Sequence, residues 1–174
     1  EKRRRQAEII RRSGKRMQHL IEDLLDVSRI EAGALVVRPS LEELLPILEE
    51  ARDLFNEQAA GRGIRLEVDP AGGEPSARVD RDRVMQALSN LLDNAIRLTP
   101  EGGVVRMSAR EEGSEVVVMV SDTGPGIPPE LQSRLFDRFS QAGVGKRGAA
   151  GLGLTIVRGV ASAHAGNVAV DSQV

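Results

Sequence analysis

The sequence has 174 residues, enough for one ordinary domain with a short appendage, and its 40% hydrophobic and 29% charged residues are typical of a folded protein. Cysteine is absent, which excludes disulfides and thiolate metal sites, and the only three aromatic residues are phenylalanines, which argues against nucleic-acid binding by stacked rings. Eight Lys or Arg against two Glu give residues 1–16 a net charge of +6, which leaves −8 for the rest of a chain whose net charge is −2. We interpret the basic run as a solvated helix face, although such a run could also contact phosphate or an anionic membrane. Because no apolar stretch approaches the roughly 20 residues of a membrane span, we expect a soluble segment.

Residues 1–32 are predicted to form one helix. Ile10, Met17 and Leu24 recur at intervals of seven residues, with further apolar residues between them. This heptad spacing indicates packing against another helix, and Gly33 is the predicted stop. Because one helix cannot bury such a stripe alone, we expect its partner to come from a helix missing from this chain or from a second copy.

A second helix is predicted over residues 41–60, with Ser40 as its N-cap and Glu43 at capping-box spacing. Alternating apolar residues at 63–69 predict a strand, and the Pro- and Gly-containing residues 70–75 predict a loop.

The middle of the chain alternates between a helix and a hairpin. A third helix is predicted over residues 80–98 and is closed by the turn residues 99–103. Residues 104–110 and 115–121 are then predicted to be two antiparallel strands that turn at 112–114.

The C-terminal third is rich in glycine and proline. The predicted order is a loop at 122–129, a short helix at 131–139, a glycine-rich segment at 143–153, a helix at 154–164 and a final strand at 168–171. Strands and helices mixed in this way predict an α+β fold, a two-layer sandwich in which helices cover one face of a mixed sheet. Little sequence remains for the closing strand, so we expect the last strand to be truncated.

Several common site motifs are absent. No P-loop pattern occurs, and the Rossmann fingerprint fails because Ile156 stands where its third small residue belongs. His19 and His164 are the only histidines, and neither has a neighbour whose spacing indicates a catalytic triad or a metal site. We therefore interpret both as core or surface residues.

One stripe of the third helix is polar. Asn90, Asn94 and Arg97 lie at positions i, i+4 and i+7 and hence on one face of the helix. Two carboxamides offer neutral oxygens to a hard cation, and a guanidinium offers a fork to phosphate. A solvated polar face is the commoner outcome for such a stripe taken alone.

The loop after the hairpin combines a carboxylate with glycines. Asp122 ends an apolar strand, and Gly124 and Gly126 would let a ligand approach the backbone. A carboxylate in this position can accept a hydrogen bond from an amino group such as that of adenine. A tight turn without a ligand is an equally good interpretation of this loop alone.

The last predicted helix opens with two glycines. Gly151 and Gly153 would leave free backbone N–H groups at a positive helix end, which suits a phosphate. The preceding residues 141–150 include Lys146 and Arg147 among three glycines, a composition that fits a lid over a nucleotide. Without a ligand, the same residues would be a glycine-rich loop.

Taken together and in this order, these segments resemble the catalytic core of a sensor histidine kinase, a GHKL-type ATPase. The matching segments are the asparagine box at 90–100, the first glycine box at 122–128, the phenylalanine box at 135–139, the second glycine box at 151–154 and, upstream, the second helix of a dimerisation and phosphotransfer hairpin at 20–33. Each box alone is weak, but four boxes in order at family spacing are strong, and together with the upstream helix the resemblance covers nearly the whole chain.

The resemblance implies that Mg²⁺ and ATP bind here. Asn94 would hold Mg²⁺ between the ATP phosphates, Asn90 would support Asn94, and Arg97 stands where a lysine usually contacts phosphate. Asp122 would bind the adenine amino group. The other residues implied to line the nucleotide are Leu98, Gly124, Gly126, Ile127, Gly151, Leu152, Gly153 and Leu154, with Lys146 and Arg147 as lid contacts.

The resemblance also implies the organisation and partners of the protein. Residues 1–34 would be part of the dimerisation and phosphotransfer domain, and residues 35–174 would be the catalytic ATP-binding domain. A phosphoryl group would pass from ATP to a histidine and then to an aspartate on a response-regulator receiver domain. The intact protein would be a homodimer through the helical hairpin, would bind no nucleic acid and would be cytoplasmic, with any membrane attachment through segments outside this chain.

The sequence departs from the family pattern at several positions. The phosphoacceptor histidine box is absent, and His19 does not replace it. Leu98 stands where an aromatic ring often flanks adenine, and Ala149 and Ala165 stand where glycines are usual. These changes could weaken nucleotide binding, but none removes the chemistry of Asn94 or Asp122.

Two alternatives follow from the same residues. ATP-hydrolysing GHKL relatives carry a general-base Glu where Asn90 stands, and an amide cannot take a proton from water. We therefore expect slow hydrolysis. The second alternative is a dimerisation or docking module whose nucleotide site is degenerate, which Leu98 and Ala149 would explain.

Overall fold

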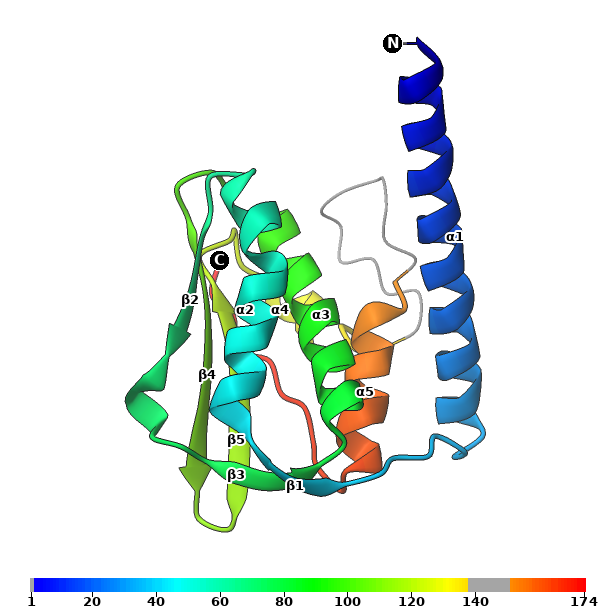
Figure 1. Cartoon of the computed structure of the whole chain (residues 1–174). Helices are drawn as coiled ribbons and strands as arrows, with labels where there is room; N and C mark the ends of the chain where they lie inside the picture. Colours follow the sequence, from blue (N-terminus) through cyan, green and yellow to red (C-terminus); the bar gives the residue numbers. More distant parts are fainter. Residues whose placement is uncertain (1, 138–150) are drawn as a thin grey trace.

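The computed structural model describes residues 2–137 and 151–174 (Figure 1). In chain order the elements are α1 (Lys2–Glu31), β1 (Ser40–Glu43), α2 (Leu44–Ala60), β2 (Arg65–Asp69), the short 3₁₀ helix η1 (Pro70–Gly72), β3 (Ser76–Val79), α3 (Arg81–Leu98), β4 (Val104–Glu112), β5 (Glu115–Asp122), α4 (Pro129–Gln132) and α5 (Gly153–Ala163). Helices α2, α3 and α5 lie on one side of the main sheet, and α1 stands beside α5 and extends past it (Figure 1). Among the described helices, even the 30-residue α1 is too polar to serve as a membrane span.

The main sheet has three strands in the order β2-β4-β5. Strand β2 runs parallel to β4, and β4 runs antiparallel to β5, so the sheet is mixed. Side chains of β4 alternate as period-two sterics require: Val105 and Met107 are buried, whereas Arg106 between them is exposed. The α+β sandwich with a mixed sheet covered by helices is therefore confirmed.

The core between sheet and helices is aliphatic, as the scarcity of aromatic residues requires. Its larger buried members from α2, α3 and β4 are Leu44, Ile47, Leu48, Leu88, Leu92, Ile96, Val105 and Met107. Phe55 is only partly buried at the edge of this cluster. Because α3 buries one face here, its opposite face is free to carry polar side chains.

The predicted N-cap at Ser40 is wrong. Residues Ser40–Glu43 form β1, which pairs antiparallel with β3, and α2 begins only at Leu44. The Ser40 hydroxyl donates to Glu42 Oε1 (2.6 Å) rather than capping a helix, and the Leu44 amide donates to the Pro75 carbonyl (3.0 Å). Pairing with residues far along the chain thus overrides a local capping pattern.

Other helix ends follow local signals. Gly33 adopts φ 62° just after α1, as a left-handed stop requires, and the Asp80 carboxylate caps α3 by accepting from the Arg83 amide (3.2 Å). At the end of α5, Ala165 adopts φ 58°, a backbone conformation that favours glycine.

The predicted final strand at 168–171 is not formed in the described part of the chain. Instead, the residue directly after this segment contacts the loop after β5. The Ile127 amide donates to Ser172 Oγ (2.9 Å), and Gln132 Nε2 donates to the Ser172 carbonyl (3.0 Å). Gly126 is needed there, since a Cβ at this position would collide with the Gln173 carbonyl. The helix expected at 131–139 is also shorter, because α4 ends at Gln132, and Phe139 lies outside the described residues.

Candidate functional site

The polar face of α3 is the first component of the site. Asn90, Asn94 and Arg97 are all half-buried on the face opposite the aliphatic core. Arg97 Nη2 donates to Asn94 Oδ1 at 2.6 Å, and Asn90 Nδ2 donates to the Gln86 carbonyl at 3.1 Å. The amide oxygen of Asn90 is thereby left facing away from its own helix.

The start of α5 lies against that oxygen. A Cβ placed on Gly153 would be 2.6 Å from Asn90 Oδ1 and 3.2 Å from its Cγ, so any larger residue here would force the Asn90 carboxamide out of its present position. Gly151 adopts φ 69° immediately before the helix. No side chain caps the first turn of α5 among the described residues, which leaves its first N–H groups available to an anion.

The loop after β5 is the third component. Asp122 Oδ1 accepts from the Gly124 amide at 2.8 Å, and no described group donates to its other oxygen. A Cβ on Gly124 would be 2.5 Å from Asp122 Oδ1 and 3.6 Å from the Leu98 carbonyl. The loop therefore lies against the end of α3, with Ile127 half-buried beyond it.

Not every predicted nucleotide residue faces this region. The Leu152 side chain is 4% exposed and packs with Val27, Ile156 and Val160 against α1, so only its backbone can line the site. Leu98 and Leu154 are half-buried. The predicted lid residues Lys146 and Arg147, together with Ala149, lie outside the described residues.

The chemistry of these groups suits a nucleotide with a divalent cation. No group of three or more His, Asp or Glu that could hold a metal ion occurs in the part of the chain that the structure describes. A cation would therefore take most of its ligands from phosphate and water, which Mg²⁺ prefers, and one from the neutral Asn94 oxygen. Arg97 and the uncapped start of α5 supply the positive potential that phosphates need, while Gly124 and Gly153 bring the backbone close.

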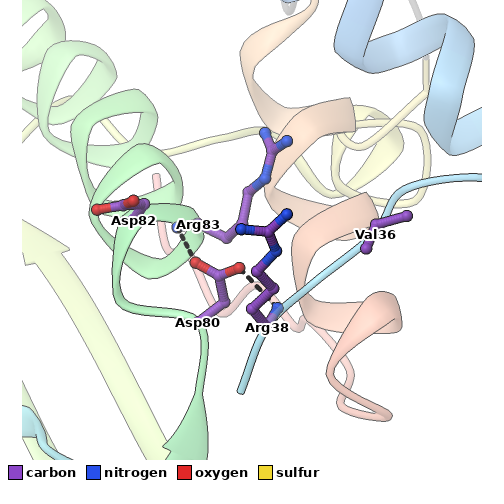
Figure 2. Close-up of a pocket in the computed structure, with 5 residues that line it drawn as sticks. All are labelled: Val36, Arg38, Asp80, Asp82 and Arg83. Atoms are coloured by element: carbon purple, nitrogen blue, oxygen red, sulfur yellow. Dashed lines mark hydrogen bonds between the residues drawn. The ribbon is translucent and has the colours of Figure 1, made fainter. Parts of the chain in front are cut away.

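A separate hollow of about 330 Å³ lies at the other end of α3. Figure 2 shows Asp80 at its centre, bound to the backbone amides of Arg38 and Arg83, and the remaining lining residues are Val36 and Asp82. Burial raises the pKa of the Asp80 carboxyl, but these amide hydrogen bonds and the Arg83 charge outweigh that effect and hold the pKa below its ordinary value. None of the predicted nucleotide residues lines this hollow, and Asp80 at its centre lies about 21 Å along the axis of α3 from Asn94.

Two residues that support the site were not singled out from the sequence. Gln86 lies one turn before Asn90, and its backbone carbonyl accepts a hydrogen bond from the Asn90 side-chain amide. The Gln86 side chain in turn donates to Asp26 of α1 (2.7 Å). The four-residue spacing of Gln86 and Asn90 was readable in the sequence. Nothing in the sequence marked Asp26, because its partners on α3, Arg83 and Gln86, are some 60 residues away.

Comparison with known proteins identifies the family. Residues 79–174, more than half of the chain, match the family described as histidine kinase-, DNA gyrase B- and HSP90-like ATPases, and residues 1–33 match the His kinase A phospho-acceptor domain. The alginate biosynthesis sensor protein KinB of Pseudomonas aeruginosa is 34% identical over 172 residues, which are 97% of this chain but 29% of KinB. The chain thus spans less than a third of that relative.

Solved structures agree. Full-length ShkA in complex with AMPPNP superposes with a TM-score of 0.82 at 29% identity, covering 94% of this chain and 34% of ShkA. The histidine kinase ThkA in complex with the response regulator protein TrrA gives a TM-score of 0.66 at 26% identity, covering 86% of this chain and 43% of ThkA. The chain belongs to the family of histidine kinase-, DNA gyrase B- and HSP90-like ATPases.

Proposed function

We propose that this chain is the ATP-binding catalytic core of a two-component sensor histidine kinase and binds Mg-ATP between α3, the loop after β5 and the start of α5. The observation that carries the proposal is the approach of Gly153 to Asn90 Oδ1, which joins the carboxamide face of α3 to an uncapped helix start. A neutral oxygen, a guanidinium and free N–H groups then converge where a triphosphate and its cation can be held.

Each residue would have a distinct role. Asn94 would offer its oxygen to Mg²⁺ and Asn90 would support it, while Arg97 would leave Asn94 and contact phosphate. Asp122 would accept a hydrogen bond from the adenine amino group through its unpaired oxygen. The residues that would shape the pocket are Leu98, Gly124, Gly126, Ile127, Gly151, Leu152, Gly153 and Leu154, with Lys146 and Arg147 in the lid.

The reaction would be phosphoryl transfer, in which the protein acts mainly by positioning and electrostatic stabilisation. The γ-phosphoryl group would pass from ATP to a histidine absent from this chain, and then to an aspartate of a response-regulator receiver domain. The match of residues 1–33 to the phospho-acceptor domain and the solved complex of ThkA with a response regulator support this assignment. Residues 1–34 would be part of the phosphotransfer domain and residues 35–174 the catalytic domain.

The exposed stripe of α1 supports homodimerisation of the intact protein. Its apolar members are between 40% and 71% exposed: Ile10, Met17, Leu20, Ile21, Leu24 and Leu25. Such a stripe at heptad spacing needs a partner helix, which the hairpin of the intact protein would supply. The catalytic core would work in the cytoplasm, whether or not the parent protein is anchored in a membrane elsewhere.

The test is titration of a fluorescent ATP analogue with and without Mg²⁺. We expect Mg²⁺ to tighten binding by the wild-type chain and Asn94→Ala to remove that Mg²⁺ effect. Asn56→Ala, the same change on an exposed position of α2, is the matched control and should bind like wild type. Metal-independent binding, or an unaffected Asn94→Ala variant, would contradict the proposal, and no binding at all would favour the docking-module alternative.

Hydrolysis distinguishes this function from that of the ATP-hydrolysing relatives. The side-chain NH₂ group of Asn90 donates to the Gln86 carbonyl, and the side-chain oxygen of Asn90 cannot act as a general base for water. We therefore expect slow hydrolysis of ATP, and appreciable steady-state turnover would reverse the assignment.

A further inference from the structure

Helix α1 is fastened to the ATP-binding domain through a carboxylate that the nucleotide site does not use. Asp26 is only 7% exposed. One of its oxygens accepts from Gln86 Nε2 (2.7 Å) and Arg83 Nη1 (2.9 Å), and the other accepts from Arg29 Nη1 (3.4 Å). Because a buried charge is tolerated only when it is paired and hydrogen-bonded, this cluster needs α1 and α3 in one relative position.

An apolar seam continues the contact onto α5. Val27 is fully buried against Leu152, which directly precedes α5, and against Ile156 and Val160 of α5. One turn later, Ile30 lies over Gly159, where a Cβ would collide with the isoleucine side chain. The absence of a side chain at Gly159 therefore lets α1 approach the α5 backbone directly.

The linker between α1 and the domain is also tied down. The Arg38 amide donates to Asp80 Oδ2 (2.8 Å), while Asp80 Oδ1 accepts from the Arg83 amide (Figure 2). Arg83 thus contacts both anchor points: its backbone binds Asp80 and its guanidinium binds Asp26.

Two contacts of α1, made by Asp26 and by Val27, lead to the proposed nucleotide site. Gln86 binds Asp26 with its side chain and Asn90 with its carbonyl, and Asn90 Oδ1 rests against Gly153. Leu152, held by Val27, is the residue directly before Gly153. Two independent routes from α1 therefore end at the contact between Asn90 and the start of α5.

We propose that Asp26 is a positioning residue that holds the ATP-binding domain docked on α1, and that this docking preorganises Asn90 and the start of α5 for the triphosphate. Movement of α1 away from the domain then lowers nucleotide affinity. By thermodynamic reciprocity, bound nucleotide strengthens docking to the same extent. The nucleotide part of this inference rests on the proposed function, whereas the docking part does not.

The relative position of α1 and the domain depends on Asp26 more than on the apolar contacts, for an electrostatic reason. Burial raises the pKa of its carboxyl, but hydrogen bonds from Gln86 and Arg83 and the charges of Arg83 and Arg29 outweigh burial and lower the pKa. The carboxylate is therefore charged throughout the neutral range. Removing the charge leaves Arg83, whose side chain is 23% exposed, without its ionic partner, whereas the apolar contacts alone tolerate sliding.

Docking is measured by the distance between spin labels on Gln18→Cys in α1 and Glu49→Cys in α2, both at exposed positions. The chain has no other cysteine, and dilution with unlabelled chain suppresses distances between molecules. We expect one narrow distance for wild type and a broad distribution for Asp26→Asn. The swapped pair Asp26→Arg with Arg83→Asp should restore the narrow distance, and Asp53→Asn, an exposed Asp on α2, is the matched control.

Affinity for the fluorescent ATP analogue is then measured on the same variants. We expect Asp26→Asn to weaken binding by about 5- to 150-fold, the usual range of coupling between sites, and the swapped pair to recover most of that loss. Circular dichroism checks that each variant keeps its helices. Recovery by the swapped pair is a result that simple loss of folding would not give.

Each outcome decides one part of the inference. An unchanged distance distribution in Asp26→Asn overturns the role of Asp26 in docking. A broad distribution with unchanged analogue affinity overturns the coupling. If the wild-type chain binds no analogue, the proposed function and the coupling both fail, but the distances still decide whether Asp26 holds α1.

Discussion

Gly153→Ala should reduce nucleotide affinity while leaving stability almost unchanged. The new Cβ would lie 2.6 Å from Asn90 Oδ1, so the Asn90 side chain must rotate and give up its hydrogen bond to the Gln86 carbonyl. That loss costs about 1 kcal/mol, and the better helix propensity of alanine offsets up to about 1 kcal/mol. The midpoint of thermal unfolding should therefore move by no more than about 4 °C.

Affinity responds differently because both disturbed groups face the proposed triphosphate. Hydrogen bonds to charged groups contribute about 1.5–3 kcal/mol, so losing one should weaken binding of the fluorescent ATP analogue about 10- to 100-fold. Gly14→Ala is the matched control, since nothing lies within 4 Å of a Cβ at that exposed position of α1. Its affinity should equal that of wild type.

A double-mutant cycle isolates the steric cause. With Asn90→Ala already present, the colliding oxygen is gone, and Gly153→Ala should cost little further affinity. If Gly153→Ala binds the analogue as tightly as wild type, or if its cost is the same in both backgrounds, then the contact between Asn90 and Gly153 does not shape the site.

Three further predictions concern stability, each measured by urea unfolding. Ala165→Gly should stabilise the chain by about 0.5–1 kcal/mol, because Ala165 adopts φ 58°, and an unchanged midpoint would contradict that strain. Thr99→Val should stabilise by about 1 kcal/mol, because the Thr99 hydroxyl is buried and has no partner among the described residues; a loss would reveal a partner. Because folding lowers the pKa of Asp26, its charge stabilises above the ordinary aspartate pKa, and that contribution is lost as pH falls through the lowered value. The stability difference between wild type and Asp26→Asn should therefore stay constant from about pH 5 to 8 and shrink below about pH 4, and a change near neutrality would contradict it.

Predictions based on local signals succeeded where the signal had no long-range competitor. Gly33 stops α1 with a left-handed backbone, and α3 (Arg81–Leu98) lies within one residue of the predicted helix 80–98, because both depend on residues within a few positions. Ser40 carried an equally good capping pattern, but β3 lay in a four-residue stretch with no recognisable strand signal, and pairing with it made Ser40 part of a strand. The sequence could not show which of these two outcomes was lower in free energy.

The residues of the candidate site show the same division between features set by local spacing and features set by the fold. Residues within each motif were found from the sequence because their spacing is local, as for Asn90 and Asn94 on one turn after another of α3. The contacts between motifs depend on the fold: Gly153 meets Asn90 across 63 positions, and Leu152 turns its side chain to α1 rather than to the proposed nucleotide site. A glycine-flanked leucine gives no sign of which side it faces until the position of α1 is known.

The choice of groups at the α1 seam bears on how the docked state could be reversible. A seam made only of Val27, Ile30 and their aliphatic partners would tolerate several registers, since dispersion and hydrophobic burial are not directional. A single buried carboxylate with donors from Arg83, Gln86 and Arg29 permits one register, because any slide leaves a charge unpaired. The interface is at the same time partly polar, which resembles contacts between domains that separate rather than permanent ones. These two properties together describe a contact that is specific when made and costs little free energy to break, which the proposed transfer of a phosphoryl group to a separate histidine would require.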